Sequence, residues 1–151
     1  MMRISKLADY GTIIMVYFAN CDQQFSNARD IAHSTHLNIP TVSKLLKLLT
    51  ADGLLKSLRG INGGYCLQRD ANKISIADII YAVEKQRGLT ECSTNQNCSL
   101  HLVCNMQKNW QFISRIIENT LANISLTTLA TSVLPTNKIN IDSNDLRVKR
   151  A

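Results

Sequence analysis

Three cysteines, Cys92, Cys98 and Cys104, follow one another at intervals of six residues, and the polar residues STNQN fill the first interval. Six residues advance an α-helix by about 600°, so neighbouring thiols on a continuous helix would point in different directions. The polar spacer instead predicts a loop on which the three thiols converge. Thiolates gathered on a loop are suitable ligands for soft metals and for iron–sulphur clusters.

Other uses of these thiols agree less well with the sequence. Structural zinc sites typically use cysteine pairs separated by about two to four residues, which is closer than the spacing here. A disulfide would leave the third thiol unpaired, and unrelated core cysteines would not lie in so polar a segment. Cys21, at the end of an apolar helical run, and Cys66, in a strand-like run, are instead interpreted as small core side chains.

Length and charge limit the architecture and the partners. With 151 residues the chain is long enough for one hydrophobic core, and 45% hydrophobic and 19% charged residues are typical of a globular domain. The net charge of +6 and the isoelectric point near 9.2 favour a polyanionic partner. Nucleic acid is the first candidate and an anionic membrane surface the second.

The start of the chain does not resemble a membrane anchor. The apolar run Gly11–Ala19 is far shorter than the roughly 20 residues that span a bilayer. Arg3 and Lys6 precede it as in a signal peptide, but Asn20 replaces the small residue of a cleavage site and Asp9 interrupts the approach. Five cysteines are an odd number in a chain large enough to fold without disulfides. We therefore expect a cytoplasmic protein with reduced thiols.

The first third of the chain predicts two helices that precede a basic segment. Apolar residues at helical spacing predict a helix that begins at Ser5 or Asp9 and ends near Asn20. Ser26 is expected to cap a short second helix that ends near Thr35.

A third helix and a hairpin are expected next. The helix begins after the N-cap Asn38, tolerates Pro40 in its first turn and ends before Gly53. Two short helices joined by a tight link are typical of a helix-turn-helix. The strand-like runs Leu54–Leu58 and Tyr65–Leu67 are separated by RGINGG, whose glycines permit the positive φ angles of a reversal. A hairpin in this place is a wing.

Beyond the wing, Ser75 is expected to cap a fourth helix, and a longer helix is expected from about Val103. Ser125 caps one further turn, and residues 132–151, which are polar and without periodicity, are expected to form a flexible tail. The longer helix has an apolar residue at every third or fourth position, which predicts contact with another helix. These residues are Met106, Trp110, Ile113, Ile117, Leu121 and Ile124.

The third helix and the wing both have residues suited to DNA. A recognition helix presents short polar groups to base edges and cations to phosphates, and a slim basic wing reaches a flanking minor groove or phosphate. The alternative is a solvated lysine face beside a tight glycine turn, but basic residues on two adjoining elements favour DNA binding. The candidate residues are Thr41, Ser43, Lys44 and Lys47 on the helix and Arg59 and Gly60 on the wing.

Three stretches resemble the Rrf-type winged-helix transcriptional regulators. They are RISKLADYG near the start, NIPTVSKLLKLLTADGLLKSLRGINGGYCL in the middle, and the C-x₅-C-x₅-C pattern after the fourth helix. The group includes IscR, the regulator of iron–sulphur cluster assembly operons, and NsrR, the nitric-oxide-sensing repressor. Within the group the likeness is greatest to regulators of the SUF assembly system.

The resemblance implies a mainly α fold with a small β-hairpin: a winged helix-turn-helix with a long dimerisation helix. In the implied homodimer each winged helix binds one half of a palindromic DNA operator. The implied divisions are a DNA-binding domain (1–85), a cysteine cluster loop (86–104), a dimerisation helix region (105–131) and the tail (132–151).

The resemblance also implies that the three cysteines of the triplet hold an iron–sulphur cluster of the [2Fe-2S] or [4Fe-4S] type. Assembly regulators have a histidine three residues after the third cysteine, where this chain has Gln107, a poorer iron ligand. Asp9 matches the position at which the nitric-oxide-sensing branch uses a first-helix acid from the opposite subunit, and His101 lies within the triplet. We expect Asp9 as the fourth ligand slightly ahead of His101; a helix-start carboxylate and a surface histidine are the alternatives.

We therefore expect a cluster-binding regulator that represses genes for iron–sulphur cluster assembly. A nitric-oxide or redox sensor of the same fold is the first alternative. A zinc-bearing winged-helix module that binds proteins is an alternative of another class. An enzyme is not expected, because the sequence has no phosphate-binding loop and no nucleophile with a recognisable base.

Overall fold

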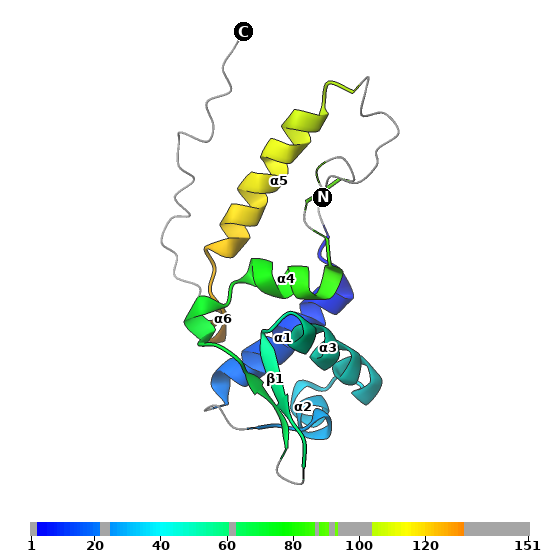
Figure 1. Cartoon of the computed structure of the whole chain (residues 1–151), viewed down its shortest axis with the longest axis vertical. Coiled ribbons are helices and arrows are strands. Elements are labelled where there is room, and N and C mark those ends of the chain that lie inside the picture. The colour runs from blue at the N-terminus through cyan, green and yellow to red at the C-terminus, as the bar shows by residue number, and fades with distance from the viewer. Residues whose placement is uncertain are drawn as a thin grey trace.

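The computed structural model of the chain (Figure 1) describes residues 3–21, 25–60, 63–86, 88–90, 93 and 104–131. Within these residues the fold is mainly helical with one two-stranded antiparallel sheet, as the sequence predicted. The elements are α1 (Lys6–Asn20), α2 (Ala28–Thr35), α3 (Ile39–Ala51), β1 (Leu55–Leu58), β2 (Gly64–Leu67), the 3₁₀ turn η1 (Ala71–Lys73), α4 (Ile76–Glu84), α5 (Gln107–Ala122) and α6 (Leu126–Ala130). The predicted tail, residues 132–151, lies outside the described residues.

Side-chain caps fix the starts of most helices, and several are the predicted residues. Ser5 caps α1 and Asn38 caps α3, each by accepting a backbone N–H of the first turn, at 3.1 and 2.9 Å. At α4, Ser75 accepts the N–H of Asp78 while the Asp78 carboxylate accepts the N–H of Ser75, which is a capping box. The helix boundaries therefore follow local sequence signals at these three positions.

The cap predicted for α2 is wrong by one residue. Asn27, not Ser26, accepts the backbone N–H groups of the first turn, at 2.9 and 3.0 Å. Ser26 is buried, and its backbone exchanges N–H···O=C bonds in both directions with Tyr65 of β2. Its hydroxyl accepts a hydrogen bond from Tyr17 at 3.1 Å. Ser26 is thus engaged with the wing, a partner far along the chain that local sequence does not reveal.

The two cysteines outside the triplet differ in burial. Cys66 is buried in β2, as predicted, whereas Cys21 is only partly buried because α1 ends there. The prediction of a core side chain therefore holds for Cys66 only.

Cys21 also affects the pKa of the neighbouring Tyr17. The hydrogen bond to Ser26 acts to lower the pKa of Tyr17, but burial and the Cys21 thiol leave that pKa above its ordinary value.

The wing is a short hairpin whose second strand contacts the segment before α2, close to the hairpin turn. β1 and β2 pair from Leu55 with Leu67 to Leu58 with Gly64. At Gly64 a Cβ atom would lie 2.6 Å from the carbonyl oxygen of Ser26, a distance that no side chain tolerates. Glycine at this position therefore allows β2 to pair closely with the α1–α2 connection.

The core contains buried apolar residues from every described α-helix except α5. Helix α6 belongs to this core, since Leu126 has no exposed surface. The N–H of Leu126 donates to the carbonyl of Ile74 at 2.7 Å, and the N–H of Ile76 donates to the carbonyl of Ile124 at 3.0 Å. These bonds hold the end of α5 beside the start of α4.

Helix α5 extends away from the core, as Figure 1 shows. It begins at Gln107, later than the predicted Val103, because Cys104 is not helical and no side chain caps the turn at Met106. Ser114 is its only buried residue, whereas Met106 and Ile113 are 48% and 37% exposed. An apolar face of α5 is therefore not covered by the described part of its own chain.

The described helices include none with the length and apolar character of a membrane span.

Candidate nucleic-acid interface and cysteine segment

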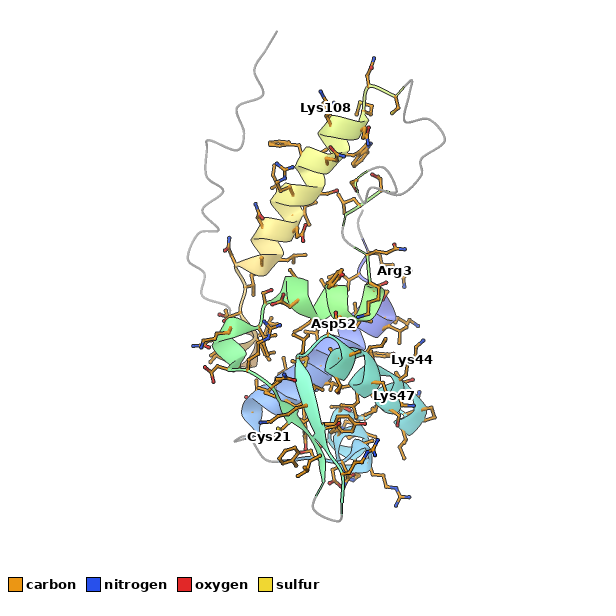
Figure 2. The ribbon with its side chains drawn as sticks, in the orientation of Figure 1. Arg3, Cys21, Lys44, Lys47, Asp52 and Lys108 are labelled. Carbon is orange, nitrogen blue, oxygen red and sulfur yellow. The ribbon has the colours of Figure 1, made fainter. Side chains whose placement is uncertain are left out.

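Helix α3 has an apolar inner face and a polar, basic outer face. Among the described residues, neither Lys44 nor Lys47 forms an ion pair. Figure 2 shows both lysines on the outer side of the helix. The inner face consists of four side chains without exposed surface: Val42, Leu45, Leu46 and Leu49. The predicted recognition residues are all accessible: Thr41 and Ser43 in part, Lys44 and Lys47 more fully.

The wing, which follows α3 along the chain, adds a second basic position. Arg59 directly follows β1 and is exposed, as is Gly60, which adopts a φ of 121°. Residues 61 and 62, at the tip of the hairpin, lie outside the described residues. Since α3 leads through a two-residue turn into Leu54 and β1, the two predicted DNA-contacting elements are neighbours in the fold.

Replacing Arg59 with alanine should weaken DNA binding and reduce its dependence on salt. One phosphate contact releases about one counterion, so the slope of log affinity against log salt should fall by about 1 for each bound subunit, which is about 2 for a dimer on its operator. Lys73→Ala is the matched control, because Lys73 pairs with Asp70 on η1, away from the wing. Both can be measured by fluorescence anisotropy across a salt series. An unchanged slope for Arg59→Ala would show that Arg59 does not meet a phosphate.

The cysteine segment, residues 86–104, connects α4 to α5, and the structure describes only part of it. Cys104 is a partly buried free thiol just before α5, while Cys92, Cys98 and His101 lie outside the described residues. Among the described residues no group of three metal-binding side chains is assembled. Asp9 is exposed in the first turn of α1. The predicted cluster ligands therefore remain a prediction.

The described first part of the cysteine segment is held by hydrogen bonds. The backbone N–H of Leu89 donates to Ser114 Oγ at 3.1 Å, which accounts for the one buried residue of α5. On either side of Cys92, the N–H of Ser93 donates to the carbonyl of Thr90 at 2.9 Å, and the Ser93 hydroxyl donates to the same carbonyl at 2.7 Å. The segment is thus attached to α5 before the position of the first cysteine.

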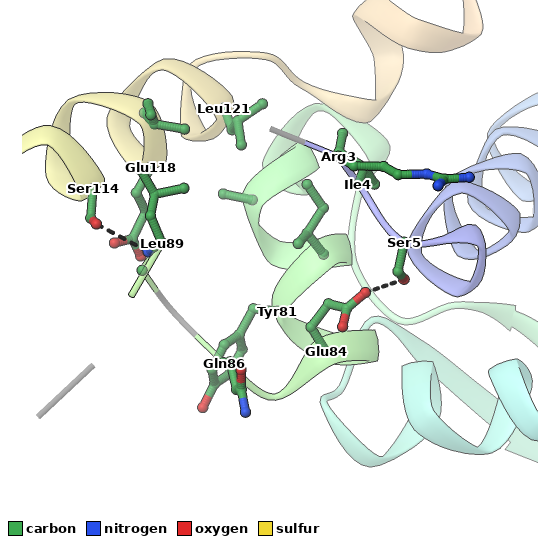
Figure 3. Close-up of a pocket in the computed structure, with 14 residues that line it drawn as sticks. Arg3, Ile4, Ser5, Tyr81, Glu84, Gln86, Leu89, Ser114, Glu118 and Leu121 are labelled. Atoms are coloured by element: carbon green, nitrogen blue, oxygen red, sulfur yellow. Dashed lines mark hydrogen bonds between the residues drawn. The ribbon is translucent and has the colours of Figure 1, made fainter. Parts of the chain in front are cut away.

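A cavity of about 300 Å³ lies between α4, α5 and the residues that precede α1 (Figure 3). Ile80 and Tyr81 of α4 and Ile117 and Leu121 of α5 line it, together with Ile4. The sequence did not predict this cavity, although its periodicity placed Ile117 and Leu121 on a face predicted to contact another helix. The inner part of that face is directed towards α4 across an incompletely filled space.

Two polar contacts fix the end of α4. Glu84 accepts a hydrogen bond from Ser5, the cap of α1, as Figure 3 shows, and Lys85 forms an ion pair with Asp52, the C-cap of α3. Lys85 adopts a left-handed conformation, φ 58°, and its ammonium lies 5.9 Å from the ring of Tyr81. A carboxylate at the C-terminus of a helix interacts unfavourably with the helix dipole. Lys85 compensates the charge of the Asp52 carboxylate at the end of α3. The chain enters the cysteine segment directly after this contact.

Comparison with known proteins decides the family. The model of the Rrf2 family, described as an iron-dependent transcriptional regulator, matches residues 4–132. The chain belongs to the Rrf2 family. Among Rrf2 relatives, IscR of Xenorhabdus nematophila is 30% identical over 83% of this chain and 77% of its own length, and Protein rrf2 of Nitratidesulfovibrio vulgaris is 27% identical over 93% and 96%.

Solved structures of Rrf2 proteins share the fold. CymR, the global cysteine regulator of B. subtilis, superposes with a TM-score of 0.68 at 27% identity, covering 88% of this chain and 99% of CymR. IscR of T. potens gives 0.66 at 27% identity, covering 87% and 89%. The predicted likeness to winged-helix regulators related to IscR is confirmed. The protein is a transcriptional regulator with a DNA-binding winged helix.

Proposed function

We propose that this Rrf2 protein represses genes for iron–sulphur cluster assembly, that it binds a palindromic operator as a homodimer in the cytoplasm, and that an iron–sulphur cluster regulates it. Relatives named IscR and the iron-dependent family description support the assignment. The accessible residues of α3 and the exposed Arg59 support contact with DNA. The further likeness of the sequence to SUF-system regulators supports cluster assembly genes as the target.

The apolar face of α5 supports the homodimer. Met106 and Ile113 are exposed there, and Trp110 is only partly buried. A contiguous apolar surface of this kind is typical of a protein–protein interface. Two antiparallel copies of α5 would cover this face and place two winged helices on one duplex.

The donor set of the cysteine segment fits an iron–sulphur cluster. Cys104 is a free, partly accessible thiol three residues before the start of α5, and cysteine sulphur is the usual protein ligand of iron–sulphur clusters. When bound, the cluster would supply a centre that iron shortage and oxidants remove, and it would join the thiolates of Cys92, Cys98 and Cys104. Asp9, which is exposed on α1, is available to a partner subunit as the fourth ligand, with His101 as the alternative.

The contacts at the start of the cysteine segment are the observation that carries the proposal. Its start follows Lys85, which is paired with the end of the recognition helix α3, and Leu89 is bound to α5. Ordering of the segment would therefore act together on the recognition helix α3 and on α5, the helix proposed to join the two subunits. A difference in DNA affinity of about 1–3 kcal/mol between two such states is sufficient for regulation.

Anaerobic purification followed by iron and sulphide analysis tests the cofactor. The intact protein should be coloured, and Cys98→Ala should lose the visible absorption while remaining a folded dimer. Cys21→Ala is the matched control and should keep the colour, since Cys21 lies at the end of α1, outside the triplet. Colourless protein with stoichiometric zinc would favour a zinc-bearing interaction module instead. Binding to duplexes from upstream of cluster assembly genes tests the proposed target.

A nitric-oxide or redox sensor of the same fold is the second candidate. It is favoured by Gln107 at the start of α5, in place of a histidine, and by the exposed Asp9. Anaerobic titration separates the two functions. Loss of the absorption at stoichiometric nitric oxide, with stability towards iron chelators, would favour the sensor.

A further inference from the structure

Ile39, the first residue of the recognition helix α3, is 48% exposed and has no evident role in the fold. Asn38 already caps the helix through the N–H of Thr41. The hydrophobic pair that normally supports a helix start is also provided, because Leu37 and Val42, on either side of the first turn, both pack in the core cluster. The exposed side chain of Ile39 is therefore not needed to start α3.

The first turn of α3 presents mainly apolar side chains on its exposed surface. Ile39 and Pro40 are exposed, and neither side chain has a hydrogen-bond donor or acceptor. Thr41, the next residue, has a methyl group as well as a hydroxyl and is partly exposed. The first turn of the helix thus lacks the arginine, asparagine or glutamine side chains that read guanine or adenine by paired hydrogen bonds.

The place of this apolar turn decides what it meets. In helix-turn-helix proteins the N-terminal residues of the second helix lie against base edges in the major groove. The one apolar group on those edges is the C5 methyl of thymine. Single exposed apolar side chains are common on protein surfaces, so exposure alone would carry no meaning. Here the exposed isoleucine lies on the turn that enters the groove.

We propose that Ile39 is a specificity residue that contacts the C5 methyl group of a thymine in each half of the operator. The inference rests on DNA binding by the winged helix and does not depend on the iron–sulphur cluster. The contact favours thymine over cytosine, which has a hydrogen atom at C5 in place of the methyl group, and Pro40 adds apolar surface beside it.

Deoxyuridine provides the test, because it differs from thymidine only by this methyl group. Operators are first selected from random duplexes with the intact protein, and each thymine is then replaced in turn by deoxyuridine. One replacement per half-site should weaken binding by the wild type about three- to tenfold, the range expected for one or two buried methyl-sized groups. Ile39→Ala should weaken binding to the thymine operator by a similar factor and should bind thymine and deoxyuridine there equally. Ile39→Val should lie between the two.

Ile13→Ala is the matched control, since Ile13 is 39% exposed on α1 and is not on the recognition helix. It should keep the full sensitivity to deoxyuridine. Equal sensitivity of wild type and Ile39→Ala at every thymine would overturn the inference while leaving operator binding intact. Undiminished affinity of Ile39→Ala for the thymine operator would overturn it too. If selection yields no preferred sequence, the proposed operator binding itself fails.

Discussion

Replacing Ile113 with glutamate should separate the proposed homodimer into monomers and lower the affinity for the proposed palindromic operator by about 10²- to 10⁴-fold. Ile113 lies in the middle of the apolar face of α5 and is 37% exposed in the single chain. Burying an unpaired carboxylate in the dimer costs far more than leaving it in water, and symmetry introduces two of them. Without the dimer each winged helix binds alone and loses the high effective concentration of its neighbour.

Asn119→Glu is the control for this experiment. Asn119 is exposed on the same helix, about 140° around the axis from Ile113 and Ile117 taken together, and so lies off the apolar face. The control should remain dimeric and bind the operator normally. Light scattering gives the mass of each variant, and anisotropy gives its DNA affinity. A dimeric Ile113→Glu protein would show that α5 is not the subunit interface.

Much of the fold was predictable because its signals are local. Asn38 and Gly53 bracket α3, and the Ser75 cap fixes the start of α4, in agreement with the structure. The cap of α2 was mispredicted because Ser26 pairs with Tyr65, which is distant in sequence. The start of α5 was mispredicted because apolar periodicity continues through Met106 although no side chain caps the preceding turn.

The contacts that surround the cysteine segment could not be predicted in the same way. Leu89 and Ser114 are 25 residues apart, Asp52 and Lys85 are 33 apart, and Ser5 and Glu84 are 79 apart. Hydrophobic periodicity shows which face of a helix is buried, but not which polar side chains meet across helices. The triplet spacing is itself a sequence signal, so Cys92, Cys98 and Cys104 are testable by substitution without further geometry.

Gly64→Ala should destabilise the protein by about 3 kcal/mol. The new Cβ would lie 2.6 Å from the carbonyl oxygen and 2.8 Å from the carbonyl carbon of Ser26, so one backbone must move. Movement breaks the two hydrogen bonds between Ser26 and Tyr65, worth about 1 kcal/mol each, and adds backbone strain of about 1 kcal/mol or more. Urea unfolding measures the loss.

Gly53→Ala separates this steric effect from the conformational preference of glycine. Gly53 has a φ of 69° at the end of α3, but a Cβ there would meet nothing within 4 Å. It should therefore cost only about 1 kcal/mol, the penalty for a left-handed alanine. If Gly64→Ala proved no more destabilising than Gly53→Ala, the start of β2 would be able to shift relative to Ser26 at little cost. A fixed β2 matters for the proposed function, because the predicted contact of Arg59 with DNA requires the strand paired with β1 to be held beside α2.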